Sequence, residues 1–208
     1  MPQVSLAEWI AASQQGDCLL SFPTDTVPAL AVRPDRAELI FAAKQRSQTK
    51  PLILMGATAA DLWPFVQSPV HPLEPQWQRA ADRYWPGAVT LVLPASDRLP
   101  PAINPIDPTS VGLRVPNHPI ARHLLAQTGV LATTSVNRSG EPALLDFAQI
   151  NAQFPNVKTL QPSEIDRLER SGFANPPPSG LPSTVVQWSI DGWKILRQGN
   201  IEFRSDAS

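Results

Sequence analysis

Short apolar runs alternate with amphipathic segments along most of the chain. Apolar runs of strand length occupy residues 18–22, 52–55, 88–93, 110–116 and 131–135. Apolar residues recur at helical spacing over residues 6–16, 35–44, 57–66, 76–84 and 119–127. Strands mixed with helices of about ten residues predict an α/β or α+β fold built on one sheet.

Local signals define several helix ends. Ser5 and Glu8 have the spacing of a capping box, and Gly16 is suited to end the helix that follows. Asp35 is the predicted N-cap of the second helix, and Thr58 is predicted to open the third. The chain therefore begins with a helix that leads into the first apolar run.

The C-terminal quarter has a different character. Residues 164–170 predict a short charged helix, and the proline-rich residues 175–182 predict an extended connector or a mobile cover. Asp191 and Gly192 form a turn signal between residues 183–188 and 193–197, which predicts a hairpin. We expect one domain over residues 1–203 and a disordered tail over residues 204–208.

Composition narrows the class of protein. The chain has 208 residues, of which 42% are hydrophobic and 17% charged, so it is long enough to bury a core. Its formal charge of −1 disfavours a surface covered with basic residues for bulk nucleic-acid binding but allows a local basic groove. The single cysteine, Cys18, cannot form an internal disulfide, and no basic leader or long apolar segment is present. We expect a cytoplasmic protein with no membrane partner.

Two neighbouring segments carry the candidate chemistry. Thr24, Asp25 and Thr26 follow an apolar run at a position where open α/β sheets bind ligands. A helix then ends in the cations Lys44, Arg46 and Lys50, which suit phosphate groups but also complement a helix dipole. These cations are therefore either a phosphate site or ordinary helix-end charges.

Several ordered motifs resemble those of the YrdC-like family of threonylcarbamoyl-AMP synthases. They are PTDTV from residue 23, KxR with KPL over residues 44–52, YWPGAVTLVL from residue 84, VGLRVPNHP from residue 111, TSVNRSGEP from residue 134, STVV from residue 183 and LRQG from residue 196. The resemblance covers about residues 5–202. It implies a single-domain twisted sheet of mixed parallel and antiparallel strands, flanked by helices, with a basic concave cleft.

The reaction implied by the resemblance uses L-threonine, bicarbonate or CO₂, and ATP. It yields threonylcarbamoyl-AMP and pyrophosphate for the modification of a tRNA adenosine beside the anticodon. Mg²⁺ would arrive with ATP, and no protein metal site is expected. The implied partners are the three substrates, the downstream threonylcarbamoyl transfer proteins, and tRNA or double-stranded RNA.

The family motifs also imply roles for individual residues. The predicted catalytic residues are Lys44 and Arg46, and Arg114 would bind the carboxylate of threonine. The predicted ATP-binding residues are Lys44, Arg46, Lys50, Ser110, Ser135, Asn137 and Arg197. The predicted threonine-binding residues are Thr24, Thr26, Arg114, Thr133 and Ser183. For Arg114 the alternative is a structural ion pair, and for the hydroxyls it is local turn bonding.

The chain also departs from the family pattern near the small-substrate motif. Pro28 replaces an aromatic residue, and Ala29 and Ala31 replace glycines. Ser47, Met55, Val136 and Ala143 are further departures. The alternative hypotheses are a diverged paralogue with another acceptor or little activity, and a module that binds structured RNA without chemistry.

Overall fold

The computed structural model describes residues 2–47, 49–67 and 74–204. The strands are β1 (Gln3–Val4), β2 (Leu20–Phe22), β3 (Ala29–Val32), β4 (Ile53–Met55), β5 (Val89–Pro94), β6 (Ser110–Arg114), β7 (Leu131–Ser135), β8 (Thr159–Leu160), β9 (Thr184–Ser189) and β10 (Gly192–Arg197). The helices are α1 (Leu6–Gln15), α2 (Glu38–Lys44), α3 (Ala59–Leu62), α4 (Glu74–Tyr84), α5 (Pro119–Thr128), α6 (Phe147–Gln153) and α7 (Pro162–Arg170). Short 3₁₀ helices are η1 (Pro34–Arg36), η2 (Trp63–Phe65) and η3 (Pro101–Ile103).

Eight of these strands form one mixed sheet in the order β10-β9-β5-β6-β4-β7-β3-β2. The β9/β5 and β6/β4 pairs are parallel, and the other neighbouring pairs are antiparallel. β1 and β8 form a separate parallel pair beside β2. The predicted mixed α/β sheet flanked by helices is therefore confirmed.

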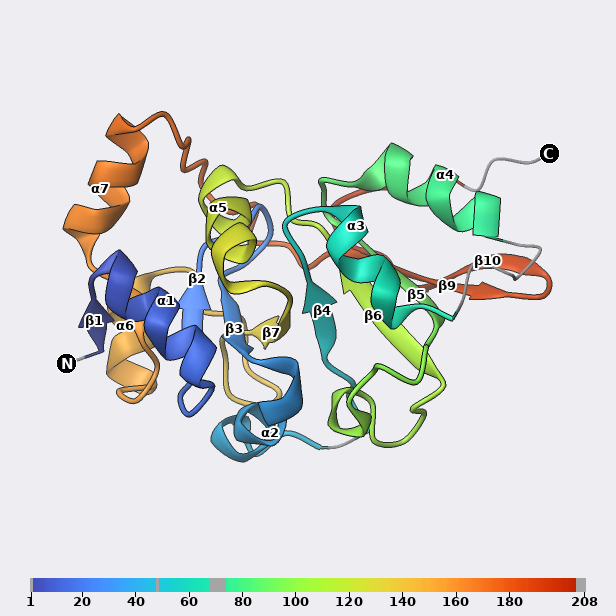
Figure 1. Ribbon diagram of the computed structural model, residues 1–208, viewed down its shortest axis with the longest axis horizontal. Coiled ribbons are helices and arrows are strands. Elements are labelled where there is room, and N and C mark those ends of the chain that lie inside the picture. The colour runs from blue at the N-terminus through green and yellow to red at the C-terminus, as the bar shows by residue number, and fades with distance from the viewer. Residues whose placement is uncertain (1, 48, 68–73, 205–208) are drawn as a thin grey trace.

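The two faces of the sheet have separate cores because strand side chains alternate between faces. In β3, Leu30 and Val32 belong to one core with α2, α3 and α4, whereas Ala29 and Ala31 belong to a second core with α1, α5 and α7. Figure 1 shows the two groups of helices at different parts of the sheet. The helices of the second core lie toward β2. They therefore do not cover the same face of the sheet near β9 and β10.

Helix boundaries follow the predicted signals at three positions and differ at a fourth. Ser5 and Glu8 form the capping box, Gly16 adopts a left-handed conformation at the end of α1, and Thr58 caps α3. The Asp35 prediction is wrong. Its carboxylate is bound by Arg33, and η1 precedes an α2 that starts only at Glu38.

Two further differences concern the N-terminal strands and the C-terminus. β3 was not predicted as a strand, and Cys18 lies before β2, half-buried rather than within it. The C-terminal hairpin is present as β9 and β10. Of the predicted tail, residues 205–208 lie outside the described residues, and the Arg204 backbone exchanges hydrogen bonds with the Tyr84 hydroxyl.

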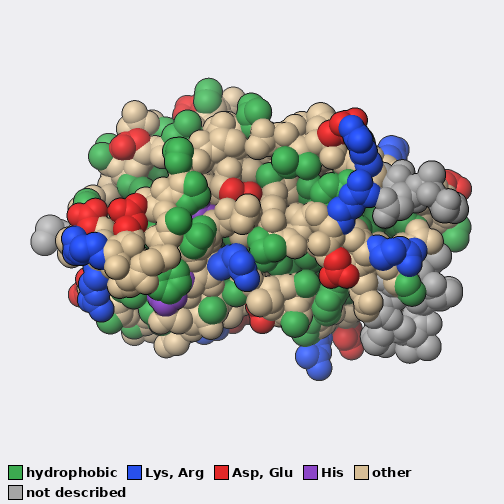
Figure 2. All heavy atoms as spheres, turned by 90° about the horizontal axis from the view of Figure 1, so that it is seen from above, with side chains coloured by type: hydrophobic (Ala, Val, Ile, Leu, Met, Phe, Trp, Pro, Cys, Tyr) green, Lys and Arg blue, Asp and Glu red, His purple; other side chains and the backbone are tan. Residues whose placement is uncertain are grey.

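The outer surface has no dominant charge on the face shown in Figure 2. Lys and Arg side chains there are separated by uncharged and acidic groups and do not merge into one basic surface. Within the described residues, no helix has the length and apolar character needed to cross a membrane. The concentration of positive charge lies instead in a cavity over the sheet.

Candidate active site

The uncovered part of the sheet forms the floor of a cavity of about 860 Å³. Val111 and Leu113 of β6 point into the core on the opposite face, so Gly112 and Arg114 line the cavity. The same alternation in β5 directs Thr90 and Val92 into it. Four cationic residues are among the described residues of its wall: Arg46, Lys50, Arg114 and Arg197.

Arg114 is the buried cation of this floor, with 2% of its surface exposed. Its Nε donates to the Gly87 carbonyl at 3.0 Å, and its Nη1 donates to Thr26 Oγ1 at 2.8 Å. Its Nη2 lies 2.6 Å from Asp25 Oδ1 in an ion pair. Burial lowers the pKa of Arg114, and the Asp25 carboxylate opposes that shift. Arg114 thus faces the cavity, and the structural ion pair given above as the alternative is present.

The two threonines of the Thr24-Asp25-Thr26 segment have different positions. Thr26 lines the cavity, and its hydroxyl accepts from Arg114. Thr24 is fully buried outside the cavity wall, and its hydroxyl donates to the Val27 carbonyl at 2.7 Å. Thr24 also accepts from the Thr26 backbone N–H. Thr24 thus shapes the turn that presents Thr26.

The buried Lys44 and the half-buried Asn137 are in contact behind Ser135. The Lys44 ammonium donates to the Ser135 carbonyl and, at 2.9 Å, to Asn137 Oδ1. Ser135 Oγ donates to the same Oδ1 at 2.6 Å, and the Asn137 amide nitrogen donates to two backbone carbonyls. Ser135 lines the cavity, whereas Lys44 and Asn137 are not in its wall. This arrangement positions Ser135 rather than exposing the lysine.

The pKa of Lys44 is lowered to about 7. Burial is the main cause, and the charges of Arg46 and Lys50 contribute in the same direction. A lysine that is only 2% exposed therefore lies close to half-protonation at neutral pH.

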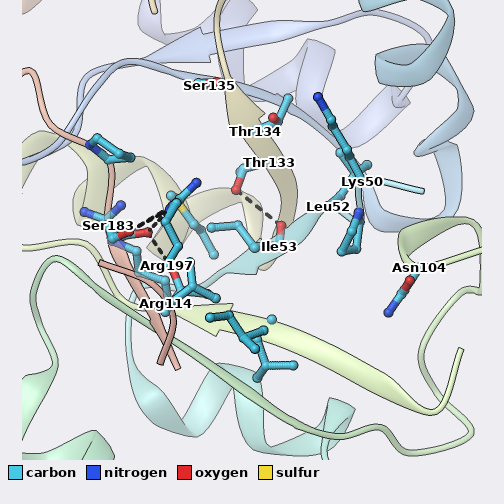
Figure 3. A pocket seen from close by; sticks show the side chains of 18 of the residues that line it. Lys50, Leu52, Ile53, Asn104, Arg114, Thr133, Thr134, Ser135, Ser183 and Arg197 are labelled. Carbon is cyan, nitrogen blue, oxygen red and sulfur yellow. Dashed lines mark hydrogen bonds between the residues drawn. The ribbon is translucent and has the colours of Figure 1, made fainter. Parts of the chain in front are cut away.

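Arg46 follows α2 and Arg197 is the last residue of β10, and both line the cavity. Arg46 donates to the carbonyls of Lys50 and Pro51, both at 3.0 Å, so it also braces the loop that carries Lys50. Arg197 donates to the Ser183 carbonyl through Nε and Nη2 (Figure 3). Burial lowers the pKa of both guanidinium groups, and Arg197 adds to the shift of Arg46.

Three predicted hydroxyls line the cavity but already have partners. Thr133 donates to the Ile53 carbonyl at 3.2 Å, and Ser183 pairs with Thr90 at 2.9 Å. Ser110 donates to Asp107 at 2.6 Å. The local-bonding alternative thus describes their state in the free protein.

Part of the cavity wall is not predictable from the sequence motifs. Thr134, Asn104 and Asp107 line the cavity, as do Pro28 and Met55 from the segments that depart from the family pattern. Thr134 follows the predicted Thr133 in β7, but strand alternation directs neighbouring side chains to opposite faces, so the strand pattern gives no signal for it. Asn104 and Asp107 lie in a proline-rich stretch that gave no signal beyond a loop.

Metal ligands are sparse around the cavity. Among residues 2–47, 49–67 and 74–204, no group of three or more His, Cys, Asp or Glu side chains is placed to hold a metal ion. A donor set of one carboxylate, two amides and several hydroxyls suits Mg²⁺ that is carried by phosphates better than Mg²⁺ held by the protein.

Known proteins resemble this chain over most of its length. Residues 12–199 match the family model Sua5_yciO_yrdC, described as "Telomere recombination". A threonylcarbamoyl-AMP synthase of Chromohalobacter salexigens is 33% identical over 82% of this chain and 89% of its own length. One from Bacillus subtilis is 31% identical over 96% of this chain and 54% of its own length.

A solved structure agrees with the sequence relatives. P. abyssi Sua5 complexed with L-threonine is 26% identical, with a TM-score of 0.76 over 95% of this chain and 55% of that one. The open sheet face and the cavity over it define an α/β protein with a cationic cavity. The chain belongs to the Sua5/YciO/YrdC family.

Proposed function

We propose that this chain is an L-threonylcarbamoyladenylate synthase. It makes threonylcarbamoyl-AMP and pyrophosphate from L-threonine, bicarbonate or CO₂, and ATP. The observation that carries the proposal is the cavity whose wall contains Arg46, Lys50, Arg114 and Arg197 together with Ser135. The names of the curated relatives and the threonine complex of P. abyssi Sua5 support the same substrates.

The chemistry needs positioning and charge stabilisation rather than a protein nucleophile. The threonine amine adds to CO₂ and loses a proton, which gives a carbamate. A carbamate oxygen then attacks the α-phosphorus of ATP, a new P–O bond forms, and the bond to pyrophosphate breaks. Cations that hold the phosphates lower the barrier by stabilising the charge that develops on their oxygens.

Arg114 is the group that we assign to the threonine carboxylate. Three of its N–H groups are occupied by Gly87, Thr26 and Asp25, so the guanidinium is fixed before substrate arrives. An arginine has five N–H donors, so two remain for a carboxylate. Thr26, Thr133 and Ser183 surround the same region and would contact the rest of the amino acid.

Arg46, Lys50, Ser135 and Arg197 are the groups that we assign to the ATP phosphates. Arg46 and Arg197 present planar forks suited to phosphate oxygens, and Lys50 is an exposed point charge at the wall. Lys44 and Asn137 would act through Ser135, which they hold in place. Mg²⁺ would enter with ATP on its phosphates.

The product is an activated donor, and we propose that it serves the formation of threonylcarbamoyladenosine in tRNA. The transfer proteins and tRNA are then partners of the product, and we expect the protein in the cytoplasm.

Pyrophosphate release from ATP tests the proposal. It should require both threonine and bicarbonate, and the adenylate product should appear in equal amount. Release that is absent, or indifferent to threonine, would refute the synthase and favour the diverged paralogue. Serine and valine as alternative acceptors test whether Pro28 and Met55 in the cavity wall alter the choice of amino acid.

A further inference from the structure

His118 is a fully buried side chain with one ring nitrogen that lacks a partner. It caps α5, where its Nδ1 accepts from the Ala121 N–H at 3.4 Å. None of its surface is exposed, and its Nε2 has no hydrogen-bond partner among the described residues. Buried polar groups are nearly always hydrogen-bonded, so Nε2 marks a bond that the free protein leaves unmade.

The chemical state of the ring follows from its surroundings. Burial lowers the pKa of His118, and the Asp25 carboxylate opposes that shift, so the imidazole is neutral at neutral pH. Because Nδ1 accepts a hydrogen bond, the single proton of the neutral ring lies on Nε2. His118 therefore holds a buried donor for which an acceptor is missing.

Two carbonyl groups of the proline-rich segment 175–182 face this ring. The Asn175 side chain and the Pro176 backbone both oppose the lowering of the His118 pKa, as acceptors near a ring N–H do. Neither is in hydrogen-bond geometry with Nε2 in the free protein. Figure 1 shows this part of the chain leaving α7 and running past α5 toward β9. The acceptor that His118 lacks is therefore available on this segment.

The two halves of the 175–182 segment are held differently. Residues 175–178 make no backbone hydrogen bond to another described residue, and most of them are exposed. In the second half, Ser179 N–H donates to the Asp25 carbonyl at 3.1 Å, and Gly180 N–H donates to the Thr26 carbonyl at 2.9 Å. The first half is thus free to move toward α5 without breaking either bond.

The segment contacts the residues that hold Arg114. Asp25 forms the ion pair with Arg114, and the Thr26 hydroxyl accepts from it. At the end of the segment, Pro182 lines the cavity and leads into Ser183, which lines it as well. The position of the segment is therefore coupled both to Arg114 and to the cavity wall.

We propose that His118 is a positioning residue of the amino-acid site, whose Nε2–H binds the first half of the 175–182 segment and holds that segment against Asp25 and Thr26 when the amino acid is bound. The inference rests on the proposed function, in which Arg114 binds the carboxylate of threonine. It adds the part of the chain that closes beside this arginine. The new bond satisfies the buried donor, and the closed segment fixes the turn that aligns Arg114.

Two substitutions separate this role from the capping of α5. His118→Asn keeps a capping oxygen, because asparagine is among the best N-cap residues, but its side chain is too short to reach the segment. His118→Gln places an amide nitrogen near the position of Nε2 but lacks the short capping oxygen. Loss of the cap lowers the stability of the fold, whereas loss of the bond to the segment acts on the amino acid.

Steady-state pyrophosphate release and thermal unfolding should therefore rank the two variants in opposite orders. We expect His118→Asn to raise KM for threonine about fivefold, as loss of one hydrogen bond implies, with kcat and KM for ATP changed less than about twofold. Its melting temperature should stay close to that of the wild type. His118→Gln should melt lower but keep KM for threonine within about twofold of the wild type. An unchanged KM for threonine in His118→Asn, or the reverse order, would leave His118 as a helix cap only and overturn the proposal.

Hydrogen exchange measures the closure itself, without turnover. Prolines have no N–H, so exchange in the segment reports on Asn175, Ser179, Gly180 and Leu181. Saturating L-threonine should slow exchange at Ser179 and Gly180 about tenfold in the wild type and in His118→Gln, but not in His118→Asn. Equal protection in both variants would overturn the proposal. If calorimetry shows that the wild type does not bind L-threonine, the proposed function is refuted and this inference falls with it.

Discussion

Arg114 combines a structural and a functional position in a single side chain. Its fork is held by a backbone carbonyl, a hydroxyl and a carboxylate from two different segments. Such a cation reaches a substrate carboxylate without reorganising, which is the advantage of a preorganised site.

Arg114→Lys should therefore damage threonine use more than nucleotide use. Lysine keeps the charge but lacks the planar fork, so it cannot hold Asp25 and Thr26 and a substrate carboxylate together. We expect KM for threonine to rise about tenfold or more, while Mg²⁺–tripolyphosphate binding changes less than about twofold. Steady-state pyrophosphate release and calorimetry measure these quantities. An unchanged KM for threonine would remove Arg114 from the amino-acid site.

The lowered pKa of Lys44 predicts that the stability of the fold depends on pH. Its pKa falls from 10.5 to about 7 in the folded chain, so between these values the unfolded chain binds more protons than the folded one. The free energy of unfolding should then rise with pH between about 7 and 10.5, and the cost of the buried charge should be complete below pH 7. Lys44→Met removes this titration.

Denaturant unfolding at several pH values between 6.5 and 9.5 measures the effect. The wild type should gain stability with pH relative to Lys44→Met. Lys194→Met, a change at an exposed lysine of β10, should behave as the wild type. Parallel curves for wild type and Lys44→Met would show that the buried lysine does not titrate in this range.

The sequence located the cations of the site but not their orientation. Lys44 and Arg46 are two residues apart in one motif, yet Arg46 lines the cavity and Lys44 points behind Ser135. The difference depends on Asn137 and Ser135, which are about ninety residues away along the chain. Pairing across such a separation is a property of the sheet, and no local pattern contains it.

At the scale of elements, β10 and its end show why the motif LRQG closes with glycine. A Cβ on Gly199 would lie 2.2 Å from the Pro182 carbonyl oxygen and 2.5 Å from the Thr184 nitrogen. Backbone atoms cannot move aside as a side chain can. The close approach keeps Ser183 at the cavity and lets the Gly199 N–H reach Thr184 Oγ1 at 3.0 Å.

Gly199→Ala should push residue 199 away from the Pro182–Thr184 backbone. We expect a loss of about 1–3 kcal/mol of unfolding free energy from overpacking, together with a drop in pyrophosphate release. Gly192→Ala at the other end of β10 is the matched control. Its φ of 100° strains an alanine, but nothing lies within 4 Å of the added Cβ. It should cost about 1–2 kcal/mol and leave turnover intact. Equal activity in both variants would show that the contact at Gly199 does not shape the site.

Elements with strong local signals were predictable, and those defined by their neighbours were not. The capping box of α1, the β9–β10 hairpin and the alternation in β6 follow from short-range chemistry. β3 is four small or aliphatic residues between Pro28 and Arg33, and it is a strand because β2 and β7 pair with both its edges. The loop over residues 104–110 is likewise held by side-chain hydrogen bonds among Asn104, Asp107, Thr109 and Ser110, which no periodic pattern in the sequence indicates.

At the scale of the whole molecule, positive charge is local rather than general. The chain has a formal charge of −1, yet four cationic residues are among the described residues that line one cavity. Attraction for a compact polyanion is therefore strong at the cavity and weak elsewhere.

ATP affinity should fall as NaCl rises from 50 to 300 mM, because salt screens charges that are partly open to solvent. Arg197→Gln should make this dependence shallower, and Arg204→Gln, a change at an exposed arginine bound to Glu202, should not.

Duplex RNA should bind weakly and compete with ATP. Duplex RNA that binds at 300 mM NaCl without displacement by ATP would support the RNA-module hypothesis instead. Calorimetry measures ATP binding, and fluorescence polarisation measures duplex RNA binding.

The proline-rich segment 175–182 has a consequence for how the chain can be split into two fragments. Ser179 and Gly180 donate from its backbone to the carbonyls of Asp25 and Thr26, and beyond it the chain enters the sheet again as β9 and β10. That hairpin brings Ser183 and Arg197 to the cavity. A chain cut within the segment would yield a large fragment lacking both residues and a short one that contains them. Reassembly of the two would restore the cavity in trans, so this fold offers a natural split site for a complementation reporter of threonine-dependent turnover.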